Sequence, residues 1–342
     1  MNHVRAGGVS LRFRPRAMVV TALLAAAAAA LAVVAIGGGE FSIGPADVVR
    51  VLLGGGDPAD AFIVRELRLP RAAAALAVGA GLGLSGAIFQ SVSRNPLGSP
   101  DFIGIGQGAS AGVLTSIVLF GAGTATAATG AVAGGLLAGA AILAITGRRG
   151  THGQRLVLVG VGVAAMLTGV NSYLLTRARI EDAARAVLWL TGSLDGRDWA
   201  DTGPLLIGLA VLVPAVLLCC ARPMRMLEMG DDAAHGLGVP VGAVRAGLLA
   251  AAIVLAALAS AAAGPVAFVA LIAPQLARKL TRTPGPNLLP SLCTGAVLLA
   301  AADLAGQRAF PGHQLPAGVV TGLLGGGYLV WLLVTERRTG RI

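Results

Sequence analysis

Long apolar stretches alternate along the chain with short polar segments rich in Gly, Pro and Arg. A stretch of about 20 apolar residues is long enough to cross the roughly 30 Å hydrocarbon core of a bilayer as an α-helix. Ten stretches approach this length, at residues 17–37, 71–91, 101–120, 126–146, 156–176, 203–221, 242–262, 264–280, 288–306 and 315–334. The pattern predicts an all-α, polytopic membrane protein with about ten transmembrane helices.

The polar segments divide the chain into three regions. Residues 1–16 form a predicted N-terminal tail, residues 17–334 a transmembrane domain, and residues 335–342 a C-terminal tail. The first apolar stretch follows several arginines, as in a signal peptide. It is longer than a typical signal-peptide core and further spans follow it, so we expect it to be retained as a span. Within the domain, a polar loop of about residues 222–241 separates two spans.

The composition excludes several classes of protein. Hydrophobic residues make up 56% of the chain and charged residues only 12%, about half the charged share of a soluble domain. This balance excludes a water-soluble globular enzyme, a disordered chain and a disulfide scaffold. The three Cys residues fall inside apolar stretches and show no disulfide or metal-binding spacing. We therefore expect no metal site in this chain.

The distribution of basic residues predicts the orientation in the membrane. The formal net charge is +10, but the basic residues are scattered between apolar blocks rather than gathered in one patch. With the N-terminus inside, 17 of the 26 Lys and Arg residues fall in cytoplasmic segments, as the positive-inside rule requires. We expect a multi-pass protein of the plasma (inner) membrane with both termini cytoplasmic and no nucleic-acid partner.

The predicted spans carry almost no ionisable side chains. Asp303 is the one candidate, and it lies near the external end of its span. A carrier driven by an ion gradient usually needs intramembrane carboxylates, histidines or paired charges, because these groups carry the coupling ion. An ion-coupled secondary carrier is therefore the disfavoured alternative from another functional class.

Three segments carry motifs in a fixed order. The first holds Arg68-Leu-Pro-Arg71 and, one span later, QSVSRNPLGSP at residues 90–100; the second is MLEMGDDAAHGLGV at 226–239, and the third is GPVAFVALIAPQLAR at 264–278. Over residues 65–334 the chain resembles the permease family of type II ABC importers for iron–siderophore complexes, haem and cobalamin. The resemblance is strongest to the ferric-enterobactin type. It implies that family's fold, with ten transmembrane helices per subunit and a permease dimer on two ATPase subunits.

Two arginines are placed at the external start of the second span. Arg68 and Arg71 there oppose both the helix dipole and the positive-inside rule, which indicates an acidic partner. Snorkelling to lipid headgroups is the alternative. In the family, arginines of this kind receive glutamates of the substrate-binding protein. The resemblance thus assigns docking to Arg68 and Arg71, with Arg308 on another external loop as a further candidate.

The segment after the second span falls on the predicted cytoplasmic side. Its prolines end the helix and hold the chain extended. The resemblance places the inner gate at Asn95, Pro96 and Leu97, with a second constriction at Thr151 and His152. A simple tight turn is the alternative.

The polar loop at 228–239 is predicted to form two short helices broken at Gly236 and Gly238. The resemblance makes it the element that couples the permease to a groove on the ATPase, while a solvated acidic face is the alternative. The coupling residues are then Glu228, Gly230, Asp231, Asp232, Gly236 and Gly238, with the acids meeting basic residues of the partner.

Two further features refine the resemblance. Position 275 is Gln where the family usually has His, and Gln keeps hydrogen-bonding capacity but cannot titrate. The chain has no Walker A motif, so it is no enzyme by itself, and ATP and Mg belong on a partner ATPase.

The resemblance implies a permease subunit of an ATP-driven importer that takes a ferric siderophore from an extracytoplasmic substrate-binding protein. It also implies a second permease subunit and two ATPase subunits. A heterodimer is favoured over a homodimer, because the enterobactin type pairs two different permease subunits. A cobalamin or haem permease is the nearest alternative.

Overall fold

A computed structural model describes residues 2–6, 9–39, 41–121, 123–147, 153–310 and 314–338. The helices are α1 (Pro15–Gly37), α2 (Pro45–Leu52), α3 (Pro58–Phe62), the π-helix η1 (Ile63–Arg68), α4 (Leu69–Ser93), the 3-10 helix η2 (Pro100–Ile103), α5 (Ile105–Phe120), α6 (Thr124–Thr146), α7 (Gly153–Arg177), α8 (Ile180–Leu190), α9 (Trp199–Ala215), the π-helix η3 (Val216–Cys220), α10 (Ala221–Leu227), α11 (Asp231–Gly236), α12 (Val241–Ala263), α13 (Val269–Thr281), α14 (Leu288–Arg308) and α15 (Ala317–Arg338). The bundle is helical, as predicted.

A β-hairpin adds to this helical architecture. Strand β1 (Asn2–Ala6) pairs antiparallel with β2 (Val9–Phe13), in a register that places Asn2 opposite Phe13. The hairpin lies in the region predicted as a tail, so the all-α description holds for the bundle and not for the N-terminal segment.

Each predicted span contains a helix, but the helices differ in length. Among the described residues, seven helices are long and apolar enough to cross a membrane: Pro15–Gly37, Pro58–Ser93, Thr126–Thr146, Arg155–Arg177, Trp199–Leu227, Val241–Ala263 and Leu288–Arg308. The predicted span at 101–120 is divided into η2 and α5, because Gly104 between them is left-handed, with φ of 90°. The predicted span at 264–280 becomes helical only at Val269, because Gly264 and Phe268 both have positive φ.

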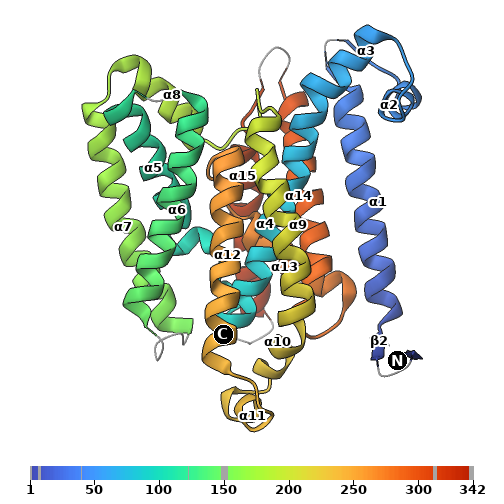
Figure 1. Ribbon diagram of the computed structural model, residues 1–342, viewed down its shortest axis with the longest axis vertical. Coiled ribbons are helices and arrows are strands. Elements are labelled where there is room, and N and C mark those ends of the chain that lie inside the picture. Colours follow the sequence, from blue (N-terminus) through green and yellow to red (C-terminus); the bar gives the residue numbers. More distant parts are fainter. Residues whose placement is uncertain are drawn as a thin grey trace.

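The central helix of the bundle is α4 (Figure 1), which packs against α9, α12, α13 and α14. Its glycines allow backbones to touch. A Cβ at Gly83 would overlap the carbonyl oxygen of Ser291 in α14, and a Cβ at Gly86 would overlap that of Ala270 in α13. Transmembrane helices associate through small residues in this way, so α4 is held along its length by its neighbours.

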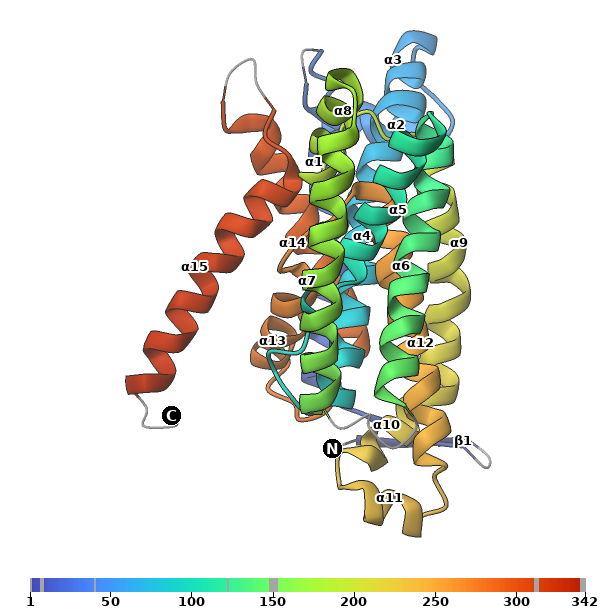
Figure 2. The ribbon, with the colours of Figure 1, turned by 90° about the vertical axis from the view of Figure 1, so that its left-hand side faces the viewer.

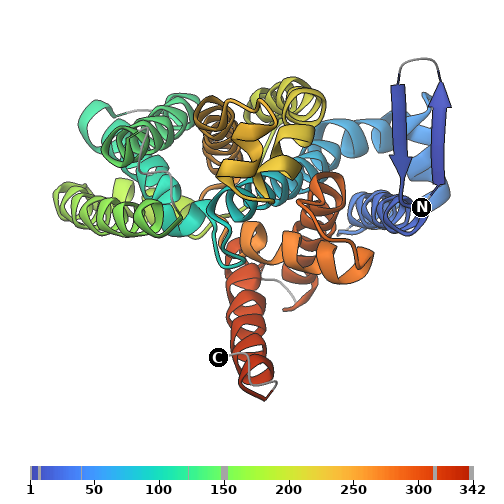
Figure 3. The ribbon, with the colours of Figure 1, turned by 90° about the horizontal axis from the view of Figure 1, so that it is seen from below.

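Two groups of helices flank this centre. Helices α5 to α8 lie on one side and α1 to α3 on the other (Figure 1). Within the first group, α5 and α6 pack closely where Gly112 faces Gly130. Helix α15 leaves the bundle at an angle and packs mainly on α13 and α14 (Figures 2 and 3). Several of its apolar side chains, including Leu323 and Trp331, are exposed.

The bundle has two ends, which we name by their short helices. The α8 end carries α2, α3 and α8, and the α11 end carries α10, α11 and the β-hairpin (Figure 2). The far end of α15 also lies toward the α11 end (Figure 2). The described chain therefore begins and finishes on the same side of the bundle, as an even number of crossings requires.

Candidate functional site

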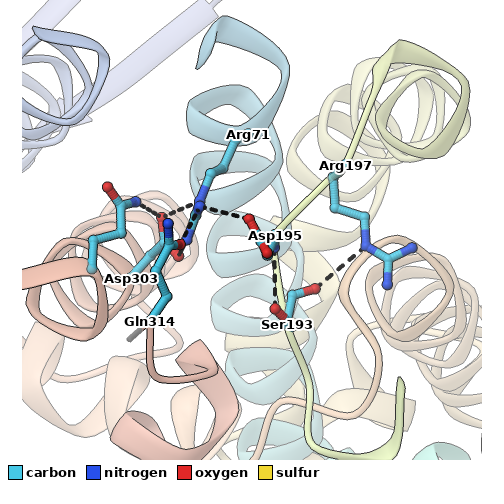
Figure 4. Close-up of polar contacts among 7 residues, drawn as sticks. Arg71, Ser193, Asp195, Arg197, Asp303 and Gln314 are labelled. Carbon is cyan, nitrogen blue, oxygen red and sulfur yellow. Dashed lines mark hydrogen bonds and ion pairs between the residues drawn. The ribbon is translucent and has the colours of Figure 1, made fainter. Parts of the chain in front are cut away.

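Arg71, in the first turn of α4, is the centre of a polar cluster at the α8 end (Figure 4). Its Nε and Nη2 donate to the carboxylate of Asp303 in α14 at 3.2 and 3.0 Å. Its Nη1 donates to Asp195 at 3.1 Å and to Gln314 at 2.8 Å, and Gln307 donates to Asp303 at 2.7 Å. These five residues form the α8-end cluster.

Burial explains why the α8-end cluster is so fully bonded. The side chains of Arg71 and Asp303 are only 17% and 4% exposed. An isolated buried charge is costly, whereas a bidentate pair with further hydrogen bonds neutralises both groups. The guanidinium of Arg71 is therefore engaged inside the chain, which argues against Arg71 as a cation that meets an external protein.

The other two predicted docking arginines lie near the end of α1. Arg68 donates to the carbonyl oxygens of Ile36 at 2.8 Å and Phe41 at 2.7 Å. Arg308, the last residue of α14, lies beside Gly38. The carbonyl end of a helix attracts cations, so α1 accounts for positive charge here without an acidic partner. Docking by these residues stays a prediction.

A cavity of about 390 Å³ opens beside the α8-end cluster. Trp189 and Arg185 of α8 line it together with Arg197. Both arginines are paired with acids: Arg185 with Asp182 at 2.8 Å, and Arg197 with Asp201 at 3.5 Å. Among the described residues, no group of three or more His, Cys, Asp or Glu side chains could hold a metal ion. The cavity thus offers an aromatic wall and charge-balanced polar walls.

A second arginine–aspartate cluster lies at the other end of α4. Asp231, the first residue of α11, accepts hydrogen bonds from Nη1 and Nη2 of Arg245 in α12, at 2.8 and 2.7 Å. It also accepts one from Nη2 of Arg94. Arg94 follows α4 in a left-handed conformation, with φ of 51°, and donates to the carbonyl oxygen of Leu227 at 2.8 Å. Arg94, Asp231 and Arg245 form the α11-end cluster.

The charge state of this cluster is fixed by its geometry. The hydrogen bonds from Arg245 lower the pKa of Asp231 below its usual value, and the charge of Arg94 acts in the same direction. Asp231 is therefore ionised throughout the neutral range. Two arginines of this chain bind Asp231, whose side chain is still 32% exposed, and a direct contact between Asp231 and an ATPase stays a prediction.

The predicted gate residues form a tight turn directly after Arg94. The side-chain oxygen of Asn95 accepts the N–H of Leu97 at 2.9 Å, and its main-chain oxygen accepts the N–H of Gly98 at 3.0 Å. Leu97 is 46% exposed. The local geometry is thus that of a turn, and gating by it stays a prediction. Thr151 and His152 lie outside the described residues.

Gln275 in α13 joins this turn to α15. Its Nε2 donates to the carbonyl oxygen of Pro96 at 2.9 Å, and its Oε1 accepts from the hydroxyl of Tyr328 at 2.9 Å. The position therefore requires one donor and one acceptor. A neutral imidazole supplies one of each as well, so Gln can fill the structural role that His would have.

The predicted coupling loop at residues 228–239 contains one short helix, α11, rather than the two predicted, and its bend lies earlier than predicted. Helix α10 before it is the end of the long helix Trp199–Leu227. Helix α10 ends at Leu227 and α11 begins at Asp231, with Gly230 at φ of 113° between them. Gly236 is instead the last residue of α11, and Gly238, at φ of 81°, follows it. The turn forms at Gly230 because glycine adopts positive φ without steric cost.

The remaining acids of this loop have no role inside the α11-end cluster. Glu228 and Asp232 are both exposed. Partial burial raises the pKa of Glu228, while the charges of Arg225 and Arg278 act in the opposite direction. The exposed acidic surface available to a partner is therefore Glu228 and Asp232.

Arg94, Arg245 and Tyr328 are not marked as site residues by any pattern in the sequence. Arg245 lies only three positions after the start of the predicted span 242–262, so the charge count treats it as a cytoplasmic loop residue. Arg94 lies within the first motif. Asp231 is the common partner of Arg94 and Arg245. No pattern in the sequence indicates that Arg94 contacts Asp231, because the two residues are 137 positions apart.

Comparisons with known proteins agree with this architecture. The FecCD transport family matches residues 17–335. The chain is 44% identical to the ferric enterobactin transport system permease protein FepG of Escherichia coli (strain K12), over 94% of this chain and 98% of that protein. It is 35% identical to the achromobactin transport system permease protein CbrC of Dickeya dadantii (strain 3937), over 98% of each chain.

One solved structure is also similar to the bundle. It is described as an inward-facing conformation of a metal-chelate type ABC transporter. The TM-score is 0.82 at 25% sequence identity, and the match covers 93% of this chain and 99% of the other.

Proposed function

The chain belongs to the FecCD transport family, and from that premise we propose that it is the permease subunit of an ATP-driven importer for a ferric siderophore. The observation that carries the proposal is the 44% identity to a ferric enterobactin permease protein over nearly the whole of both chains. The similarity to a metal-chelate type transporter supports the same class of cargo.

The proposed topology has ten spans in the inner membrane: α1, α4, α5, α6, α7, α9, α12, α13, α14 and α15. Seven of these regions have the length and apolarity of a full span. The α11 end faces the cytoplasm, because the positive-inside rule places the N-terminal arginines there. Both termini are then cytoplasmic, and the α8 end faces outward.

This orientation assigns a surface to each partner. Two ATPase subunits, which hold ATP and Mg, meet α10 and α11, with Glu228 and Asp232 as the exposed acids. The substrate-binding protein meets the α8 end, where Arg68 and Arg308 supply positive charge. A second permease subunit, in our proposal a different chain, packs on the side from which α15 extends, where α15 stands away from the rest of the bundle.

The proposed transport step is a movement of the α11 end. Closure of the ATPase subunits on ATP displaces α10 and α11, and the turn at residues 95–98 opens or closes in response. Such coupling requires contacts that differ between the two states, since an element that binds both states equally shifts neither.

The test is uptake by the purified complex in proteoliposomes. The chain is reconstituted with the ATPase, the second permease subunit and the binding protein from the same genome. We expect ATP-dependent, vanadate-sensitive uptake of a ferric siderophore. Preferred uptake of cobalamin or haem would assign the alternative cargo. Uptake that is insensitive to vanadate but abolished by an ionophore would contradict an ATP-driven importer.

A further inference from the structure

The α11-end cluster joins three parts of the chain through a single carboxylate. Asp231 belongs to α11, Arg245 to α12 and Arg94 to the end of α4. The two arginines hold it differently. Arg245 binds both carboxylate oxygens and its side chain is 7% exposed, whereas Arg94 binds through one nitrogen and its side chain is 46% exposed.

Arg94 is also next to the turn at residues 95–98. The residue immediately follows α4, and its backbone conformation starts the turn that Asn95 continues. The same Nη2 that binds Asp231 also donates to Leu227, the last residue of α10. One guanidinium nitrogen thus contacts both the end of α10 and the start of α11.

We propose that Arg94 is a positioning residue that transmits displacement of α10 and α11 to the turn at residues 95–98, with Asp231 as its contact on α11. The inference rests on the proposed function, since it assumes that α10 and α11 meet an ATPase. Arg245 holds the Asp231 carboxylate in a fixed direction. Arg94 forms the more exposed, single contact, and this is the contact that can change between states.

A purely structural role for Arg94 would have a different signature. It would lower assembly or stability and leave the coupling ratio of every assembled complex unchanged. The proposed role predicts that assembled complexes hydrolyse ATP without moving the turn. The measurements must therefore report on the turn itself and not only on uptake.

The chain offers a matched control in Arg282. Arg282 follows α13 in the same left-handed conformation as Arg94, with φ of 49° against 51°, and its side chain is exposed. Arg282→Gln and Arg94→Gln remove the same charge from the same backbone conformation. Only the second removes a contact with Asp231.

The experiment uses the full complex in proteoliposomes, with Leu97→Cys introduced after the three native cysteines have been replaced by Ser. We measure the rate at which a water-soluble maleimide labels position 97, with and without ATP, and hydrolysis with and without loaded binding protein. With Arg282→Gln, ATP should change the labelling rate as in the parent. With Arg94→Gln, the ATP-dependent change should fall at least fivefold and stimulated hydrolysis should fall toward its basal rate.

Two results would overturn the inference. One is an ATP-dependent labelling change in Arg94→Gln equal to that of Arg282→Gln. The other, if Arg94→Gln does not assemble, is full coupling in Arg94→Met, which keeps an unbranched side chain of similar reach but has no donor for the carbonyl oxygen of Leu227 or the carboxylate of Asp231. Failure of the proposed function looks different, because the parent complex itself would then show no ATP-dependent uptake.

Discussion

Each end of α4 carries an arginine that a distant aspartate engages, yet the two clusters join different kinds of element. At the α8 end, Arg71 and Asp303 join α4 to α14, two long helices whose backbones already touch through their glycines. At the α11 end, Arg94 and Asp231 join α4 to a helix of six residues that packs on α10 and α12. An arginine–aspartate pair thus stabilises the contact between two long helices, α4 and α14, at one end. At the other end it holds the short helix α11 against the end of α4.

Exposure separates the two clusters energetically. The Arg71–Asp303 pair is 17% and 4% exposed, and the Arg94–Asp231 pair is 46% and 32% exposed. Loss of one partner from a buried pair costs about 3–5 kcal/mol, whereas an exposed pair contributes about 0.2–1 kcal/mol. Breaking the Arg71–Asp303 pair at the α8 end therefore costs much more free energy than breaking the Arg94–Asp231 contact at the α11 end.

The largest effect is expected when the Asp303 carboxylate is removed from the α8-end cluster. Asp303→Ala leaves Arg71 largely buried with only Asp195 and Gln314, and we expect a loss of about 3 kcal/mol in stability. Unfolding of the purified protein in detergent measures it. The control is Asp47→Ala, which breaks an exposed pair with Arg50. Equal stability of the two variants would remove the proposed difference between buried and exposed pairs.

A smaller effect is expected from a glycine substitution in the packing contact between α4 and α14. Gly83→Ala places a methyl group against the carbonyl oxygen of Ser291 and forces the helices apart, at a cost of about 1–3 kcal/mol. At Gly81 in the same helix, a Cβ would lie 3.6 Å from Leu205, an ordinary contact. Gly81→Ala should therefore be neutral or slightly stabilising, since Ala has the higher helix propensity. If the two variants have the same free energy of unfolding, close packing at Gly83 does not stabilise the contact between α4 and α14.

Gln275, which joins the turn at residues 95–98 to α15, gives a third test, at the α11 end. Gln275→Leu removes the hydrogen bonds to Pro96 and Tyr328, and we expect a loss of about 1 kcal/mol per bond left unmade together with reduced uptake. Gln275→His restores one donor and one acceptor. Uptake by the His variant should stay within about twofold of the parent. A His variant as inactive as the Leu variant would show that hydrogen bonding is not what position 275 supplies.

The smallest effect concerns pH. Because the folded protein lowers the pKa of Asp231, the carboxylate stabilises the fold above its unfolded pKa of about 3.9 and loses this contribution only as pH falls through the lower folded value. Hydrogen exchange of α11 should thus give a constant opening free energy between pH 8 and 5, after correction for intrinsic exchange. In Asp231→Asn, α11 should open more readily at every pH in this range. An opening free energy that changed through pH 6 in the parent would point to a different titrating group.

The sequence predicted the helices better than it predicted the contacts between their ends. Hydrophobic length alone located a helix in each of the ten stretches, because burial in lipid or protein needs apolar residues over a whole span. It misplaced the start of α13, since nothing in the pattern marks Phe268 as a residue with positive φ. It also placed the bend of the coupling loop at Gly236 and Gly238 rather than at Gly230.

The arginines show why the candidate site was only partly predictable. Arg68 was expected to oppose the dipole at the start of its own helix, but that helix begins at Pro58, and Arg68 donates to the carbonyl oxygen of Ile36 in α1. Arg71 was expected to seek an external acid, and its acid is Asp303, at a sequence separation of 232. One-dimensional reasoning identified the unusual charges correctly and could not supply their partners, because those partners come from other helices.

The length of the central helix has a geometric consequence for the α8 end. Residues Pro58–Ser93 run as one helix of 36 residues, about 54 Å at 1.5 Å per residue, against a hydrocarbon core of roughly 30 Å. The length of this helix, whose first turn is α3, thus sets how far α2 lies from the hydrocarbon core. Removing one turn would bring α2 closer by about 5 Å with its direction kept, whereas removing two residues would rotate it by about 200°.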